Sequence, residues 1–117
     1  LGVDVVAGGG DHRYAGDQGA ADQARLNSPS AIARDAQGNL YIADTLNHRV
    51  RRVAAAGGAI TTIAGTGEPG YSGDGGLAVQ ARLRSPAGIA VDGRGYVYIA
   101  DTANHAVRRI TPGGVME

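Results

Sequence analysis

The chain contains one segment twice, 57 residues apart. Residues 41–52 return as residues 98–109, and 29 of the 60 positions that can be paired at this offset are identical. A repeat of roughly this length is one supersecondary unit that buries its apolar faces by stacking on its neighbours. The repeat therefore predicts two stacked units, residues 1–60 and residues 61–117, each smaller than an ordinary domain.

Each unit consists of short apolar runs separated by glycine-rich turns. In the second unit the runs cover residues 88–92, 96–100 and 106–110. The corresponding runs of the first unit, followed by a fourth, are 31–35, 40–43, 49–53 and 59–64. This spacing is typical of an antiparallel meander. The first two strands are apolar nearly throughout, which indicates cover on both faces. We predict an all-β fold in which four-stranded blades stack as in a β-propeller.

Composition argues against several classes of protein. The chain has no cysteine, which leaves no disulfide framework and no thiolate metal site. Its formal net charge is zero, whereas nucleic-acid and membrane-surface proteins usually carry a basic excess. No apolar run approaches the roughly 18–20 residues of a membrane span. The first residue is Leu1 and not methionine, so we expect a segment of a longer chain, and no feature indicates a compartment.

The repeated segments resemble a known family. Residues 44–53 and 101–110, the latter with Ala106 in place of the usual basic residue, are similar to the NHL repeat. Residues 86–92 also fit, and the first unit departs only at Ala31 and Arg34. The resemblance implies a propeller, most often of six blades, with binding or scaffolding as its default role. Some NHL relatives are lyases or hydrolases, and others bind RNA or protein on one face, so the fold alone does not assign a function.

A long glycine-rich insert precedes the first strand of each unit. In an up-and-down blade, this insert and the turn between strands two and three lie at the same end, and a surface built from loops is the usual place for binding. The candidate residues on this face are Arg13, Tyr14, Asp17, Asn47, His48, Tyr71, Asp74, Asn104 and His105.

Most of these polar residues also have a structural interpretation. The Asp-Asn-His turns satisfy backbone groups, so replacing His105 is expected to cost about 1–2 kcal/mol. Asp17 and Asp74 are expected to cap short helical turns, and Tyr14 and Tyr71 to pack over the inserts. The arginine pairs are expected on a solvated outer strand; they are Arg51, Arg52, Arg108 and Arg109. The pattern indicates no catalytic residue, no metal site and no cofactor.

The functional hypothesis is a non-catalytic binding or scaffold module. One alternative is a lyase or hydrolase that uses histidine and a metal in the channel, which a stoichiometric divalent ion would favour. Another is RNA binding, which a steep salt dependence would reveal. A protein or small-molecule ligand is expected, without an indication of which.

The chain is expected to associate with itself, because two blades cannot close a propeller. The segment with Val3, Val5 and Val6 aligns with the fourth-strand run at 59–64, whereas little chain follows Ile110. We therefore expect this segment to complete the last blade of the next copy by strand exchange. Such head-to-tail contacts form rings. A homotrimer of six blades is favoured, a homotetramer is next, and each junction would bury on the order of 2,000 Å².

Overall fold

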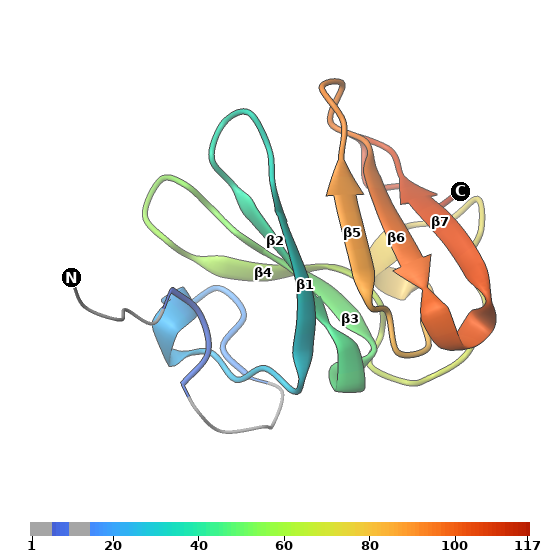
Figure 1. Cartoon of the computed structure of the whole chain (residues 1–117), viewed down its shortest axis with the longest axis horizontal. Helices are drawn as coiled ribbons and strands as arrows, with labels where there is room; N and C mark the ends of the chain where they lie inside the picture. Colours follow the sequence, from blue (N-terminus) through green and yellow to red (C-terminus); the bar gives the residue numbers. More distant parts are fainter. Residues whose placement is uncertain (1–5, 10–14) are drawn as a thin grey trace.

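The computed structural model describes residues 6–9 and 15–117, and it contains two antiparallel sheets side by side (Figure 1). The first sheet has the order β1-β2-β3-β4. Its strands are β1 (Pro29–Arg34), β2 (Leu40–Asp44), β3 (Arg49–Val53) and β4 (Ile60–Ala64). The second sheet has the order β5-β6-β7, with β5 (Gly88–Val91), β6 (Val97–Asp101) and β7 (Ala106–Ile110). The all-β prediction is confirmed.

Four single 3-10 turns are the helical elements of the described part of the chain. They are η1 (Ala21–Gln23), η2 (Thr45–Asn47), η3 (Ala78–Gln80) and η4 (Thr102–Asn104). η1 and η3 lie in the inserts, while η2 and η4 follow strands β2 and β6. Of these described helices, none has the length or apolar character that a membrane crossing requires.

The main core lies between the two sheets. Strand alternation directs Tyr41 and Val50 from the first sheet and Val97 and Ile99 from the second into this junction. Alanines of the second insert and Leu83 close the same cluster. A second cluster joins Ile42, Val53 and Ile60 on the opposite face of the first sheet to the first insert. Strands β2, β3 and β4 are therefore covered on both faces, whereas Ile32 of β1 is 67% exposed on the face of the second cluster.

The second sheet already holds the beginning of a fourth strand. Met116 bridges Ile110, and Arg109 and Glu117 exchange both backbone hydrogen bonds, at 3.0 and 2.7 Å. Ile60 makes the equivalent pairing with Val53 in the first sheet. The hairpin of the second unit is one residue shorter, so the 57-residue offset hides this match. Little chain remains for a fourth strand, as expected, but Met116 and Glu117 occupy its first two positions.

The connection from β4 to the second insert requires glycine. Gly65 has a φ of +94°, and a Cβ at this position would overlap the carbonyl oxygen of His48. The backbone of the insert therefore approaches the turn after β2 more closely than any side chain would allow. This contact fixes the second insert against the end of the first blade.

Candidate functional site

The Asp-Asn-His turns are built by local hydrogen bonds. Asp44 accepts from the Asn27 backbone N–H at 2.7 Å and from the Asn47 side chain at 2.9 Å. The second copy repeats both bonds at 2.8 Å, with Asp101 accepting from Arg84 N–H and from Asn104. Burial, partly offset by these donors, raises the pKa of Asp44. These aspartates and asparagines therefore hold the strand that leads into each blade.

The inserts contact the turns. The Asn104 side chain donates to the carbonyl of Gly70 at 2.7 Å, and Arg49 donates to the carbonyl of Thr66 at 2.7 Å. The segments that contain Thr66 and Gly70 thus lie at the same end of the blades as the Asn-His turns. Ala21 and Ala78, in the middle of the inserts, instead donate to the carbonyls of Gly58 and Gly114 in the hairpins at the other end. Of the nine candidates for this face, Arg13 and Tyr14 lie outside the described residues. Tyr71 is exposed, and its ring centroid lies 4.9 Å from the guanidinium carbon of Arg108.

Two arginines that the sequence analysis placed in solvent are buried. Arg51 is 0% exposed and Arg108 is 2% exposed. β3 is also not the outer strand, because β4 lies beyond it. Alternation places Arg51 on the same face as Val53, which belongs to the core beneath the first insert. That alternation was the available signal, and the expectation of a solvated pair holds only for the half-exposed Arg52 and Arg109.

Each buried guanidinium fastens an insert to its blade. Arg51 donates to the carbonyls of Arg25 and Ala15, both at 2.7 Å, and lies 3.6 Å from the buried Asp44. Arg108 repeats this with the carbonyls of Arg82 and Ser72 and with Asp101 at 3.4 Å. The two carbonyls in each case belong to the ends of the insert, which bridge each other. The inserts are therefore closed Ω-like loops tied to the sheet at their neck.

Asp17 and Asp74 are ion-pair partners and not helix caps. The residues that precede η1 and η3 are Ala20 and Leu77, and neither helix has a side-chain cap. Asp17 instead accepts from Arg51 at 2.9 Å and from the Thr62 hydroxyl at 2.6 Å. Asp74 accepts from Arg108 at 2.8 Å. The capping prediction is wrong because the insert folds back toward the sheet, where a guanidinium offers the stronger bond.

His48 joins the two blades. Its Nδ1 accepts a hydrogen bond from the Ser85 backbone N–H at 3.0 Å, and the neighbouring Thr45 hydroxyl donates to the Pro86 carbonyl at 2.7 Å. Burial and the charge of Arg84 lower the pKa of His48. The interpretation of histidine as a partner for a neighbouring peptide group is confirmed here. His105, in the same left-handed conformation, is exposed.

We expect His48→Ala to lower the free energy of unfolding by about 1 kcal/mol, the usual worth of one hydrogen bond. His105→Ala is the matched control, because both histidines have a left-handed φ, of 53° and 56°. The difference between the two variants then reports the bond to Ser85 alone. Urea unfolding followed by circular dichroism measures both, and equal effects would contradict this role. The loss of unfolding free energy that the sequence predicted for His105→Ala is therefore expected for His48→Ala instead.

The same bond predicts a pH dependence that serves as a second readout. Nδ1 accepts only when unprotonated, and the folded pKa lies below the unfolded value of about 6.5. The contribution of His48 is therefore fully present above pH 6.5 and is lost as pH falls through that value toward the folded pKa. His48→Ala should remove this part of the pH dependence, and His105→Ala should retain it.

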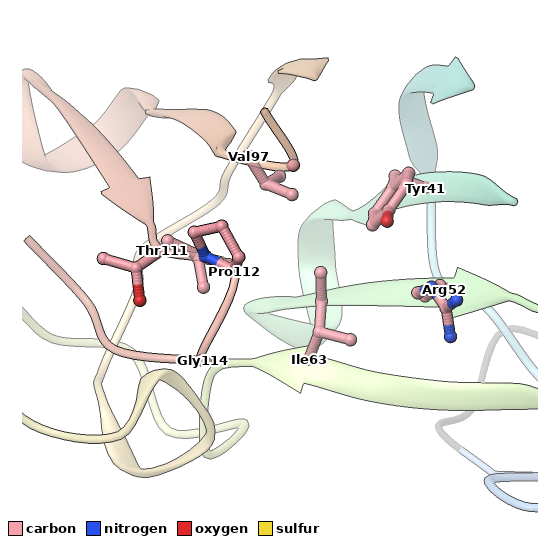
Figure 2. Close-up of a pocket in the computed structure, with 9 residues that line it drawn as sticks. Tyr41, Arg52, Ile63, Val97, Thr111, Pro112 and Gly114 are labelled. Atoms are coloured by element: carbon pink, nitrogen blue, oxygen red, sulfur yellow. The ribbon is translucent and has the colours of Figure 1, made fainter. Parts of the chain in front are cut away.

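A pocket lies between the blades near the end opposite the Asn-His turns. Its volume is about 300 Å³. Figure 2 shows Tyr41, Arg52 and Ile63 of the first blade facing Val97, Thr111 and Pro112 of the second across it. Nothing in the sequence analysis indicated this pocket, because its walls come from both blades. Within residues 6–9 and 15–117, no three His, Asp or Glu side chains come together as a metal site would require.

Antiparallel blades joined face to face, with a repeated Asp-Asn-His turn at one end, define part of a β-propeller. The family described as the teneurin NHL domain matches residues 4–54 and again residues 55–117. The chain belongs to the NHL-repeat family. NHL repeat-containing protein 2 of Gallus gallus is 35% identical over 92 residues, which are 77% of this chain and 12% of that protein. The chain therefore spans only a small part of this relative.

Two solved structures from Bacteroides thetaiotaomicron are similar in fold. One, a protein of unknown function, has a TM-score of 0.77 at 24% identity over 95% of this chain. The other, an auxiliary nutrient binding protein, has a TM-score of 0.70 at 28% identity over 89% of this chain. This chain covers 26% and 27% of those structures. The fold of this chain therefore corresponds to about a quarter of each of these two structures.

Proposed function

We propose that the chain is a non-catalytic binding and scaffold module whose copies pack head to tail into a complete propeller. The proposal rests on a comparison of faces. The outer face of each blade corresponds, by the repeat, to a face that is buried in the junction between the two blades of the chain. Similarity to an auxiliary nutrient binding protein supports a binding role. The loop face with the inserts and Asn-His turns is the proposed place for a protein or small-molecule ligand.

The apolar parts of the two faces match residue by residue. Val50 of the first blade is 0% exposed in the junction, and its counterpart Val107 on the free face of the second blade is 75% exposed. On the opposite side of the junction, Ile89 packs against the core, whereas its counterpart Ile32 is 67% exposed. A second copy that repeated the junction would bury Val107 against the blade that carries Ile32. Exposed apolar faces of this kind favour a partner.

The outer faces also carry the two residues that could repeat the His48–Ser85 hydrogen bond between copies. In the junction, His48 receives the N–H of Ser85, whose φ is 50°. On the free faces, His105 and Ser28 have the same left-handed backbone, with φ of 56° and 52°. Both halves of this hydrogen bond are thus preorganised before any partner arrives, which lowers the cost of association.

The N-terminal segment provides the strand-exchange part of the proposal. Val6 is 64% exposed and aligns with Ile63, which packs against the junction core. Val3 and Val5 lie outside the described residues. Because Met116 and Glu117 already occupy the first two positions of the fourth strand, the segment of the next copy is proposed to continue it from Val5 onward. Three copies would give six blades, and four would give eight.

Deleting residues 1–7 is expected to reduce the mass in light scattering to that of a single truncated chain, slightly below the 11.8 kDa of the full chain. Ala7 packs beneath the first insert, so the deletion also affects the first blade itself. Val6→Asp is therefore the second variant, because it changes only an exposed side chain. A Val6→Asp chain that folds and assembles like the unchanged protein would contradict the strand exchange.

A further inference from the structure

Arg52 lines the pocket between the blades and has no carboxylate partner among the described residues, whereas its repeat counterpart Arg109 has one. Arg52 and Arg109 occupy equivalent positions at the ends of β3 and β7. The guanidinium of Arg109 is paired with Glu117, with 2.6 Å between Nε and Oε1, and lies 4.8 Å from the ring centroid of Tyr96. Thr61 pairs with Arg52 where Glu117 pairs with Arg109. In the described part of the chain, no carboxylate lies within ion-pair distance of Arg52.

Asp35, which is linked to Arg52 through the Tyr41 hydroxyl, already has its hydrogen bonds satisfied. Asp35 accepts from two backbone N–H groups of its own turn, from the Asn39 side chain at 2.9 Å and from the Tyr41 hydroxyl at 3.0 Å. Burial raises the pKa of Asp35, but these four donors outweigh it and the net direction is downward. Asp35 is therefore a satisfied carboxylate in a turn. The Arg52 side chain hydrogen-bonds the uncharged Tyr41 hydroxyl, which leaves the positive charge of Arg52 without a carboxylate to neutralise it.

The remaining walls of the pocket are mostly apolar. Ile63 lies on the side of Arg52, and Val97 and Pro112 lie across from it (Figure 2). Ile110 of β7 also lines the pocket. A guanidinium presents a planar pair of donors that fits a carboxylate in bidentate geometry. A site of one such cation with aliphatic walls favours a ligand with one anionic end and an apolar body.

We propose that this inter-blade pocket binds small monocarboxylates that carry an aromatic or branched aliphatic body. The carboxylate pairs with Arg52, and the body lies between Ile63 and the side chains of Val97 and Pro112. The volume of about 300 Å³ is at the lower limit of ligand pockets, which favours a small ligand. The pocket is formed within one chain, so this inference does not depend on assembly between copies.

The test uses phenylacetate as the probe and the methyl signals of Ile63, Val97 and Ile110 in NMR titrations of the whole chain. We expect saturable shifts with a Kd on the order of 1 mM. Phenylacetamide, which has the same body without the charge, should bind at least tenfold more weakly. Inorganic phosphate should shift these methyl signals far less, because it lacks the apolar body.

Two variants and a control separate this site from general surface charge. Arg52→Gln removes the cation, and Thr61→Glu supplies the carboxylate that Arg109 has in Glu117. Each should weaken phenylacetate binding at least tenfold. Arg109→Gln, outside the pocket, should leave it unchanged. The proposal is overturned if no saturable shift appears at the three residues, if Arg109→Gln weakens binding as much as Arg52→Gln, or if phosphate binds as well as phenylacetate.

Discussion

Arg51→Met should lower the free energy of unfolding by about 3–5 kcal/mol, the usual cost of removing one partner of a buried ion pair. The substitution leaves Asp44 buried without the Arg51 cation and removes the guanidinium donors of the Arg25 and Ala15 carbonyls, of which Ala15 keeps its bond from the Arg25 N–H. Methionine restores the apolar stem but none of these bonds. A loss of this size is a large part of the total stability of a small domain, so a partly unfolded chain at 25 °C is an expected outcome.

The matched control for this variant is the next residue. Arg52→Met removes an arginine from the same strand, but one that is half-exposed and lacks a carboxylate partner among the described residues. Its expected cost is below about 1 kcal/mol. Urea or thermal unfolding by circular dichroism compares the two. Equal losses, or a loss below 1 kcal/mol for Arg51→Met, would contradict the role of Arg51 as the tie between insert and blade.

Ile32→Asp and Val107→Asp should each abolish association, and mixing the two variants should restore one junction. Each substitution places a charge on a face that must be buried, which weakens association on the order of 100-fold or more. Both residues are exposed in the single chain, so its fold should be retained. In the mixture, the intact Val107 face of one variant meets the intact Ile32 face of the other.

The expected product of mixing is a dimer of two times 11.8 kDa, about 24 kDa, which cannot extend because its outer faces are both blocked. This result is specific to a head-to-tail contact, since an isologous contact would need the same patch on both copies. If either variant associated by itself, the interface between copies would not involve the substituted face, and the prediction would be wrong. Absence of any heterodimer in the mixture would contradict complementary faces.

The strands were well predicted because the sequence contains each of them twice. The predicted runs at 49–53 and 106–110 coincide with β3 and β7, and the run at 88–92 agrees with β5 within one residue. Alternating apolar residues and glycine turns are local signals, and the two units support each other. The pairing of Met116 and Glu117 with β7 was missed because the hairpin of the second unit is one residue shorter than that of the first.

The polar interior was not well predicted, because it depends on what covers a strand and not on the strand itself. Arg51 and Arg108 look like solvated charges until the insert is seen to fold over them. His48 and His105 have the same local sequence, and only the presence of a following blade distinguishes them. The pocket beside Arg52 likewise requires both blades, so no local pattern could indicate it.

The mass of the unmodified 117-residue chain in solution tests the central claim most directly. Sedimentation equilibrium at micromolar concentration should give three times 11.8 kDa, about 35 kDa, with four copies as the next choice. The faces that carry Ile32 and Val107 should then be protected, as Ile89 and Val50 are within one chain. A stable, folded monomer of 11.8 kDa at that concentration would contradict head-to-tail assembly.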